Sequence, residues 1–304
     1  MRRAPWASRW RPVAAGALAV WLLMGALPAV SAATPAPPYP QGWTRVEGNR
    51  LTFCISAQQP LFDLEESIAR AIALAMGANP DIYVYHASAR QGPAMVIQRQ
   101  EYVILLTDYC DVFMGLPRSV NATFDYPADE QQLSTRPYYT TQFVLVSRHP
   151  HVSRLSDLPA REPVGLETAS LPSLFLSVMR PALPQRQYPG MVGSEALLDA
   201  LERGEVKTAV VWAPALFQRW PSPESVGLHV HPIQELPNME WLVVGGIRRD
   251  RTGLRTQIDA AILRLLQSGT IKAILEQHGL PPAFFRPAPL RYTPVEGDAA
   301  EHGS

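Results

Sequence analysis

The sequence predicts an α/β protein in which two mostly parallel sheets, each flanked by helices, form two lobes. Short apolar runs alternate with amphipathic stretches along most of the chain, which is the pattern of strands joined by helical crossovers. Two extended apolar runs, residues 143–146 and 242–246, divide the chain so that one α/β unit is inserted into another. A chain of 304 residues is long enough to bury the cores of two such units.

The first unit is predicted to contain three strands and one helix. The strands are short apolar runs, and the helix has apolar residues at three- and four-residue spacing before a glycine that ends it. In chain order, these elements are strand 51–55, helix 64–75, strand 81–86 and strand 110–114, which is expected to end at Gly115.

The second unit repeats this alternation, and the chain then returns to the first. Strands 163–166 and 209–212 alternate with helices 171–179 and 195–201, and two further helices follow at 254–266 and 271–278. The expected lobes are therefore 48–142 plus 245–282, and 147–240. Two extended crossings between lobes favour a hinge, with a ligand cleft at the carboxyl ends of the strands.

The N-terminus has the features of a secretory signal. Four arginines precede an apolar run at 13–27, and Val30-Ser31-Ala32 offers small residues for cleavage after Ala32. An uncleaved membrane anchor is the alternative, but the apolar run is short for a span of about 20 residues. We expect a signal peptide at 1–32, a Pro-rich linker at 33–47, a flexible C-terminal tail at 283–304 and a periplasmic location.

Charge and composition exclude several classes of function. The chain has 27 basic and 27 acidic residues, so loss of the four leader arginines leaves a net charge near −4. No basic stripe interleaved with aromatic residues is present, which argues against nucleic-acid binding. No stretch after the leader is apolar enough to span a bilayer.

The two cysteines, Cys54 and Cys110, have two interpretations. In an oxidising compartment, an even number of cysteines favours a disulfide. Two separate buried thiols are the alternative, since free cysteine is among the most buried residue types. Two cysteines without clustered histidines cannot complete a four-ligand zinc site.

The order of the segments resembles type II periplasmic solute-binding proteins of family 3, which serve ABC importers. The resemblance covers nearly the whole chain after the leader and implies the two-lobed fold of that family. It is carried by LTFCI at 51–55, CDVFMG at 110–115, TRPYY at 135–139 leading into FVLVSR at 143–148, and GEVKTAVV at 204–211.

A narrower set of stretches resembles the quinoprotein-dehydrogenase-associated binding proteins of the MoxJ/XoxJ type. These are Cys54, CDVFMGLP at 110–117, RPYY at 136–139, AVVWAP at 209–214 and GIRRD at 246–250. The subgroup carries cysteines at both positions, which adds to the case for a disulfide. The loop after Cys54 and the stretch between Gly92 and Cys110 depart from the subgroup pattern.

This narrower resemblance implies a non-catalytic role in a methanol- or alcohol-oxidising system. The implied partner is a PQQ-dependent alcohol dehydrogenase or its cytochrome, and the chain would bind the apo-enzyme, its PQQ, its metal or a small-molecule ligand. No resident cofactor or metal is expected in this chain. Two alternatives remain open: an ABC-type receptor for a small ligand other than an amino acid, and an enzyme on this fold such as a cyclohexadienyl dehydratase. The sequence contains no recognisable catalytic motif, and Glu167 is the acid nearest the expected cleft.

The expected cleft lacks the anchors that amino-acid binders of this family use. Those proteins hold the ligand ammonium with an Asp at the end of a second-lobe strand, where this chain has Trp212. The Arg for the ligand carboxylate would fall near Thr123. Arg118 is either a substitute partner for an anion or, as the sequence favours, a solvated arginine at the rim. Trp212 either stacks on a flat ligand or packs into the hinge.

Further cleft candidates follow the predicted strands. Thr168 and Ser170 precede helix 171–179, and they either present amides to an anion or cap the helix, with the cap favoured. Arg90 opens a loop after the second strand and is a candidate for cleft or partner contact. Phe62 either caps the helix or lines the cleft.

Four histidines form two H-x-H pairs, His149 with His151 and His229 with His231. On a strand, alternate residues share a face, so each pair could chelate a metal ion. Solvated histidines in loops are the favoured interpretation, and no metal site is expected.

Overall fold

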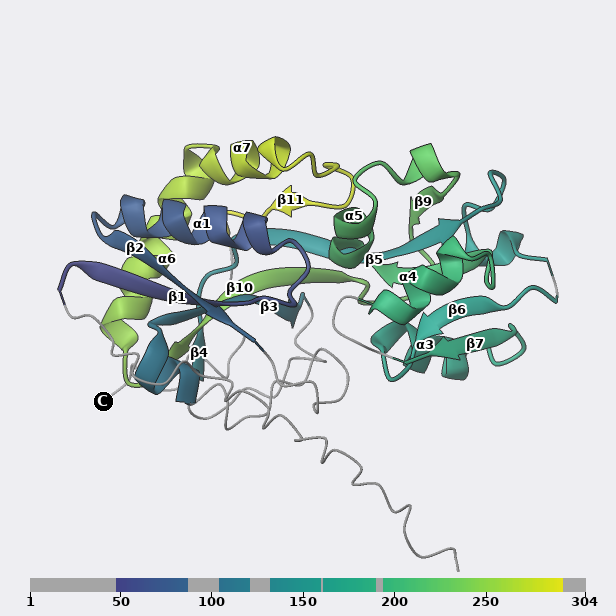
Figure 1. Cartoon of the computed structure of the whole chain (residues 1–304), viewed down its shortest axis with the longest axis horizontal. Helices are drawn as coiled ribbons and strands as arrows, with labels where there is room; N and C mark the ends of the chain where they lie inside the picture. The colour runs from purple at the N-terminus through teal and green to yellow at the C-terminus, as the bar shows by residue number, and fades with distance from the viewer. Residues whose placement is uncertain (1–47, 87–103, 121–131, 160, 190–193, 292–304) are drawn as a thin grey trace, which may run out of the picture. The chain divides into compact units, whose positions relative to one another are not determined.

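The computed structural model describes residues 48–86, 104–120, 132–159, 161–189 and 194–291 (Figure 1). The expected signal peptide, the linker and Arg90 lie outside these residues. The strands are β1 (Arg50–Ser56), β2 (Asn79–Tyr85), β3 (Val112–Ser119), β4 (Gln132–Ser134), β5 (Tyr139–Ser147), β6 (Val164–Glu167), β7 (Gln185–Tyr188), β8 (Thr208–Trp212), β9 (His229–Pro232), β10 (Glu240–Arg248) and β11 (Arg286–Pro287). The helices are α1 (Phe62–Ala75), α3 (Leu171–Met179), α4 (Glu195–Glu202), α5 (Ala213–Arg219), α6 (Thr252–Gln267) and α7 (Thr270–Gln277), with a π-helical turn at Leu105–Tyr109.

The strands form a mixed sheet in the order β2-β1-β3-β10-β5-β8-β6-β7. The expected parallel pairs are present: β1 pairs with β2 and β3, and β6 pairs with β7 and β8. Between these two sets, β10 runs antiparallel to β3 and β5, and β5 runs antiparallel to β8 and β9. The fold is therefore mixed α/β, with parallel pairs in both strand sets and antiparallel pairs between them.

Strands β5 and β10 are each nine residues long, against apolar runs of four residues (143–146) and five residues (242–246) that predicted them. Residues 139–142 of β5 pair with β10, while residues 143–147 pair with β8 (Figure 1). A single strand thus contributes to both strand sets. The sequence underestimated its length because backbone hydrogen bonds to two different partners extend it into polar residues such as Thr140 and Gln142.

Helices α1, α6 and α7 pack against one another and share a core with the first strand set (Figure 1). Phe53 and Ile55 of β1 meet Leu64 and Ile68 of α1 in this core, and all four side chains are buried. The helix ends as predicted, with Gly77 in a left-handed conformation at φ 72°. None of the helices in the described part of the chain is long and apolar enough to cross a membrane.

The cysteines form the expected disulfide. Cys54 of β1 bonds to Cys110, just before β3, and both residues are buried among Tyr83, Tyr85 and Phe113. The bond joins two segments 56 residues apart in sequence, at the point where β1 and β3 pair.

Several short elements escaped prediction, and the start of the C-terminal tail was wrong. The missed elements are too short to show an apolar periodicity, and contacts with segments elsewhere in the chain stabilise them. They are β4, β7, β9, α5 and β11. The tail was expected from residue 283, but Phe285 is buried and β11 pairs with β5 through Arg286 and Pro287. The burial of Phe285 and the pairing of β11 with β5 therefore make residues 285–287 part of the folded structure.

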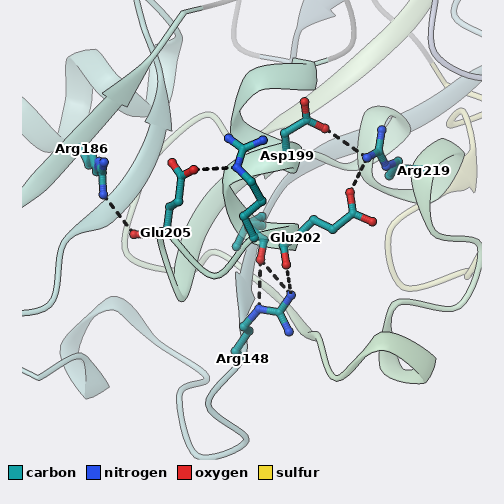
Figure 2. A network of polar contacts seen from close by, with 8 residues as sticks. Arg148, Arg186, Asp199, Glu202, Glu205 and Arg219 are labelled. Carbon is teal, nitrogen blue, oxygen red and sulfur yellow. Dashed lines mark hydrogen bonds and ion pairs between the residues drawn. The ribbon is translucent and has the colours of Figure 1, made fainter.

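An arginine-rich network joins α4 to the segments around it (Figure 2). Arg148, directly after β5, donates from Nε and an Nη to the carbonyl of Leu201, at 3.0 and 2.8 Å, and to the carbonyl of Glu202 at 3.2 Å. These carbonyls lie in the last turn of α4, where the regular amide partners of a helix interior are missing, and the carbonyl of Leu201 also accepts from the amide of Gly204 at 3.1 Å. On the other side, Arg219 of α5 contacts Asp199 and Glu202 (Figure 2). The network fixes α4 against the end of β5 and against α5.

Candidate functional site

A fully buried carboxyl group lies where α1 meets the start of β5. Glu65, in the first turns of α1, has no exposed surface. Tyr138 donates to one carboxyl oxygen at 2.7 Å and Tyr139 donates to the other at 2.8 Å. Burial raises the pKa of Glu65 to about 7, against the lowering effect of the two phenol hydrogen bonds. Sequence analysis missed this acid.

The hydroxyl of Tyr138 connects the acid to two further strands. It accepts a hydrogen bond from the amide of Gly115 in β3 at 2.7 Å, and it lies 3.4 Å from the carbonyl oxygen of Val244 in β10. Gly115 has φ 78°, and a Cβ atom there would collide with the side chain of Gln59. The backbone conformation therefore favours glycine, and a larger residue would also displace the flexible side chain of Gln59.

Four side chains lie on one face of strands β5, β8 and β10, and we call them the crossing cluster: Thr141, Phe143, Trp212 and Trp241. Trp241 lies opposite Thr141 across β10 and β5, and Trp212 lies opposite Phe143 across β8 and β5. Directly opposed residues of an antiparallel pair share a face, as do residues two apart on one strand. The ring centroids of Trp212 are 5.0 Å from Phe143 and 6.4 Å from Trp241.

Two polar atoms of the crossing cluster have no hydrogen-bond partner within the described structure. These are the hydroxyl oxygen of Thr141 and the indole Nε1 of Trp241, and both side chains are buried. Leaving a buried polar group unpaired costs about 1–3 kcal/mol. The cluster thus combines aromatic surface with unused hydrogen-bonding capacity, which is the composition of small-molecule sites.

Trp212 stands at the end of β8, where the sequence placed it, and it packs against the rings of Phe143 and Trp241. Packing at the crossing is thus observed. Its indole is half-buried, so stacking on a ligand stays a prediction.

Arg118 is not the solvated arginine that the sequence favoured. It belongs to β3, is only 8% exposed, and donates to the hydroxyl of Ser134 at 2.6 Å. The strand does not end at Gly115, because β10 pairs with β3 as far as Ser119. A role for Arg118 toward an anion stays a prediction.

Thr168 and Ser170 are engaged within the chain. The hydroxyl of Thr168 donates to the carbonyl of Tyr188 at 2.6 Å. The hydroxyl of Ser170 accepts from the amide of Ser173 at 3.3 Å and caps α3, which confirms the cap interpretation. Glu167, just before them, accepts from the hydroxyl of Ser194 at 2.7 Å, and burial raises its pKa.

Phe62 is the first residue of α1 and packs against the core of the first strand set. The cap position is Leu61, so Phe62 lies within the first turn rather than at the cap, and contact with a ligand stays a prediction.

The histidine pairs do not assemble a metal site in the described residues. His149 contacts Glu162 at 3.0 Å, and its ring lies 5.5 Å from that of His151. The sequence favoured loop positions for His229 and His231. Both residues lie on strand β9 instead, because that segment pairs with β5. No group of three or more potential metal ligands gathers in the part of the chain that the structure describes.

Solved structures with the same architecture identify the fold. MxaJ from Methlophaga aminisulfidivorans MPT matches with a TM-score of 0.54 and 18% identity, over 76% of this chain and 99% of that chain. An amino acid ABC transporter substrate-binding protein from Streptococcus pneumoniae, bound to L-arginine, matches with a TM-score of 0.52 and 17% identity, over 76% and 94%. The chain has the fold of the type II periplasmic solute-binding proteins.

An arginine-specific periplasmic binding protein from Salmonella typhimurium also matches, with a TM-score of 0.50 and 17% identity, over 75% of this chain and 98% of that chain. No protein-family model matches the sequence, and no curated protein matches it significantly. At these identities the likeness concerns the fold, and the site of this chain is built from its own residues.

Proposed function

We propose that the protein is a periplasmic, non-catalytic binding protein that assists a PQQ-dependent alcohol dehydrogenase system. The observation that carries this proposal is the likeness to MxaJ over 99% of that chain, together with the MoxJ/XoxJ-type segments in the sequence. The bond between Cys54 and Cys110 adds support, since the resembling subgroup carries cysteines at both positions.

The residues at the crossing support a role other than amino-acid transport. A zwitterionic ligand needs charged partners once it is desolvated. At the end of β8, where amino-acid binders have an acid, this chain has Trp212, whose neighbours are aromatic. In this proposal, residues 48–142 plus 245–282 and residues 147–240 act as two lobes that hinge about β5 and β10.

A receptor for a flat, uncharged small molecule is the second candidate. It is favoured by the unpaired atoms of Thr141 and Trp241 beside the half-buried ring of Trp212. A ligand that stacks on the indole and supplies a hydrogen-bond acceptor would satisfy Trp241 Nε1. An enzymatic role has less support, because the carboxyl groups of Glu65 and Glu167 already accept hydrogen bonds from hydroxyl groups within the protein and not from a substrate.

Deletion of the gene in the native organism tests the proposal. We expect PQQ-dependent alcohol dehydrogenase activity in periplasmic extracts to fall severalfold, and to return when the wild-type gene is restored. An unrelated periplasmic enzyme, assayed in the same extracts, controls for general damage to the envelope. Unchanged dehydrogenase activity during growth on methanol and on other alcohols would contradict the accessory role.

A further inference from the structure

Glu65 on α1 belongs to a hydrogen-bond network that also includes groups at the start of β5, on β3 and on β10. Its two oxygens accept from consecutive phenols at the start of β5, Tyr138 and Tyr139. The phenols are neutral donors, because burial raises the pKa of both well above the usual value. Burial of Glu65 favours the protonated acid, and the two hydrogen bonds from neutral phenols oppose this effect only in part.

The hydroxyl of Tyr138 has one proton and two acceptor positions. With Glu65 charged, the proton goes to the carboxylate and one acceptor position takes the amide hydrogen of Gly115. The carbonyl oxygen of Val244, 3.4 Å away, then receives nothing from Tyr138.

Protonation of Glu65 reverses one of these bonds. The new carboxyl O–H donates to the free acceptor position of Tyr138, so the phenol proton turns toward the carbonyl of Val244. Tyr138 keeps the amide of Gly115, and Tyr139 keeps its bond to the other carboxyl oxygen. One proton taken up by Glu65 therefore creates a new bond from β5 to β10, and both states of the acid are fully hydrogen-bonded.

We propose that Glu65 is a proton-controlled link between helix α1 and the crossing strands β5 and β10, acting through the hydroxyl of Tyr138. Its point of action on β10 is suited to this role, since the pairing of β10 with β3 shifts register between Val244 and Gly246. A carbonyl at such an irregularity has weaker support from the ladder than one in regular pairing. The link responds to pH whether or not a ligand or partner is bound, so it goes beyond the proposed function.

The other charged groups near this point have separate contacts in the described structure. On α1 itself, Glu66 pairs with Arg70. From α7, His278 contacts Ser67 on α1, and from α6, Asp259 accepts from the amide of Arg136. From β3 and β10, the groups that face the network are the backbone amide of Gly115 and the carbonyl of Val244. The titratable groups that act on Glu65 are the two phenols.

Nuclear magnetic resonance on the labelled mature protein tests the link directly. The side-chain carboxyl carbon of Glu65, the amide nitrogen of Gly115 and the carbonyl carbon of Val244 are followed from pH 5 to about pH 8.5, around the raised pKa. We expect all three signals to move with one shared midpoint near neutral pH. In Glu65→Gln the movements at Gly115 and Val244 are lost, while Glu66→Gln, a neighbouring acid on the same helix, retains them.

Tyr138→Phe separates the link from the acid itself. In this variant Glu65 still titrates, with its midpoint moved to higher pH because one hydrogen bond that lowers its pKa is gone, but the movement at Val244 is lost. A Val244 signal that stays constant in the wild-type protein while Glu65 titrates would overturn the proposal, as would a Glu65 carboxyl that is charged throughout this range. If Glu65→Gln does not fold, the wild-type titration and Tyr138→Phe decide the question.

Discussion

Replacing Glu65 with glutamine should change how stability depends on pH. Burial raises the pKa of Glu65 from 4.5 to about 7. Because the folded state holds this proton more tightly than the unfolded state, the stabilisation is fully present below pH 4.5 and is lost as pH rises through about 7. This difference in pKa between the folded and unfolded states corresponds to about 3 kcal/mol of unfolding free energy, at about 1.36 kcal/mol for each pKa unit.

The assay is urea denaturation of the mature, disulfide-bonded protein at pH values from 4.5 to 8. Many groups titrate in this range, so the informative quantity is the difference in unfolding free energy between the wild-type protein and Glu65→Gln. We expect the advantage of the wild-type protein to shrink by about 3 kcal/mol over this window. Glutamine fills the same volume but cannot titrate, so the variant itself lacks this slope.

Glu66→Gln is the matched control, since Glu66 is the next residue of α1 and its carboxylate pairs with Arg70. Its difference from the wild-type protein should stay nearly constant with pH. A constant difference for Glu65→Gln, or an advantage of the wild-type protein that grows as pH rises, would refute the reasoning about the buried acid.

Other expectations test the remaining parts of the account. Joint replacement of Cys54 and Cys110 by alanine should lower the unfolding free energy by about 4 kcal/mol, from the loop-entropy relation for a 56-residue separation, and a loss below about 1 kcal/mol in urea denaturation would contradict it. Arg148→Ala should cost about 1–2 kcal/mol in the same assay because it uncaps α4, and an unchanged midpoint would mean that the cap has no energetic role. Trp212→Ala should alter ligand or partner binding in calorimetry while circular dichroism shows a folded protein, and unchanged binding would leave Trp212 only its packing role. Intact-mass measurement of the exported protein should show a start near Ala33 and the loss of two hydrogens, whereas a retained leader would favour the membrane anchor.

The local periodicity of the sequence predicted helices α1, α3, α4, α6 and α7 well, but not α5. Helix α1 was expected at 64–75 and spans Phe62–Ala75, because its apolar spacing and Gly77 are local signals. The length of β5 could not be predicted in the same way, since residues 139–142 are held by pairing with a strand 100 residues later in the chain.

The candidate site was predicted only in part. Trp212 was found from its place at the end of an apolar strand. The position of its partner Trp241 depends on the register between β10 and β5, which could not be predicted from the sequence. Glu65 was missed because a glutamate in an amphipathic helix suggests a solvated face. A signal was available, since Glu65 stands at helical spacing with Ile68 and Ile72 and therefore on the buried face.

A pull-down tests whether this protein associates with a quinoprotein dehydrogenase, as we propose. The tagged mature protein is used to capture partners from an extract of the native periplasm and membranes, with an unrelated tagged periplasmic binding protein as control, and captured proteins are identified by mass spectrometry. We expect specific enrichment of a PQQ-dependent alcohol dehydrogenase or its cytochrome. Enrichment of an ABC permease, or a bound small molecule without any dehydrogenase, would contradict the claim and favour a solute receptor.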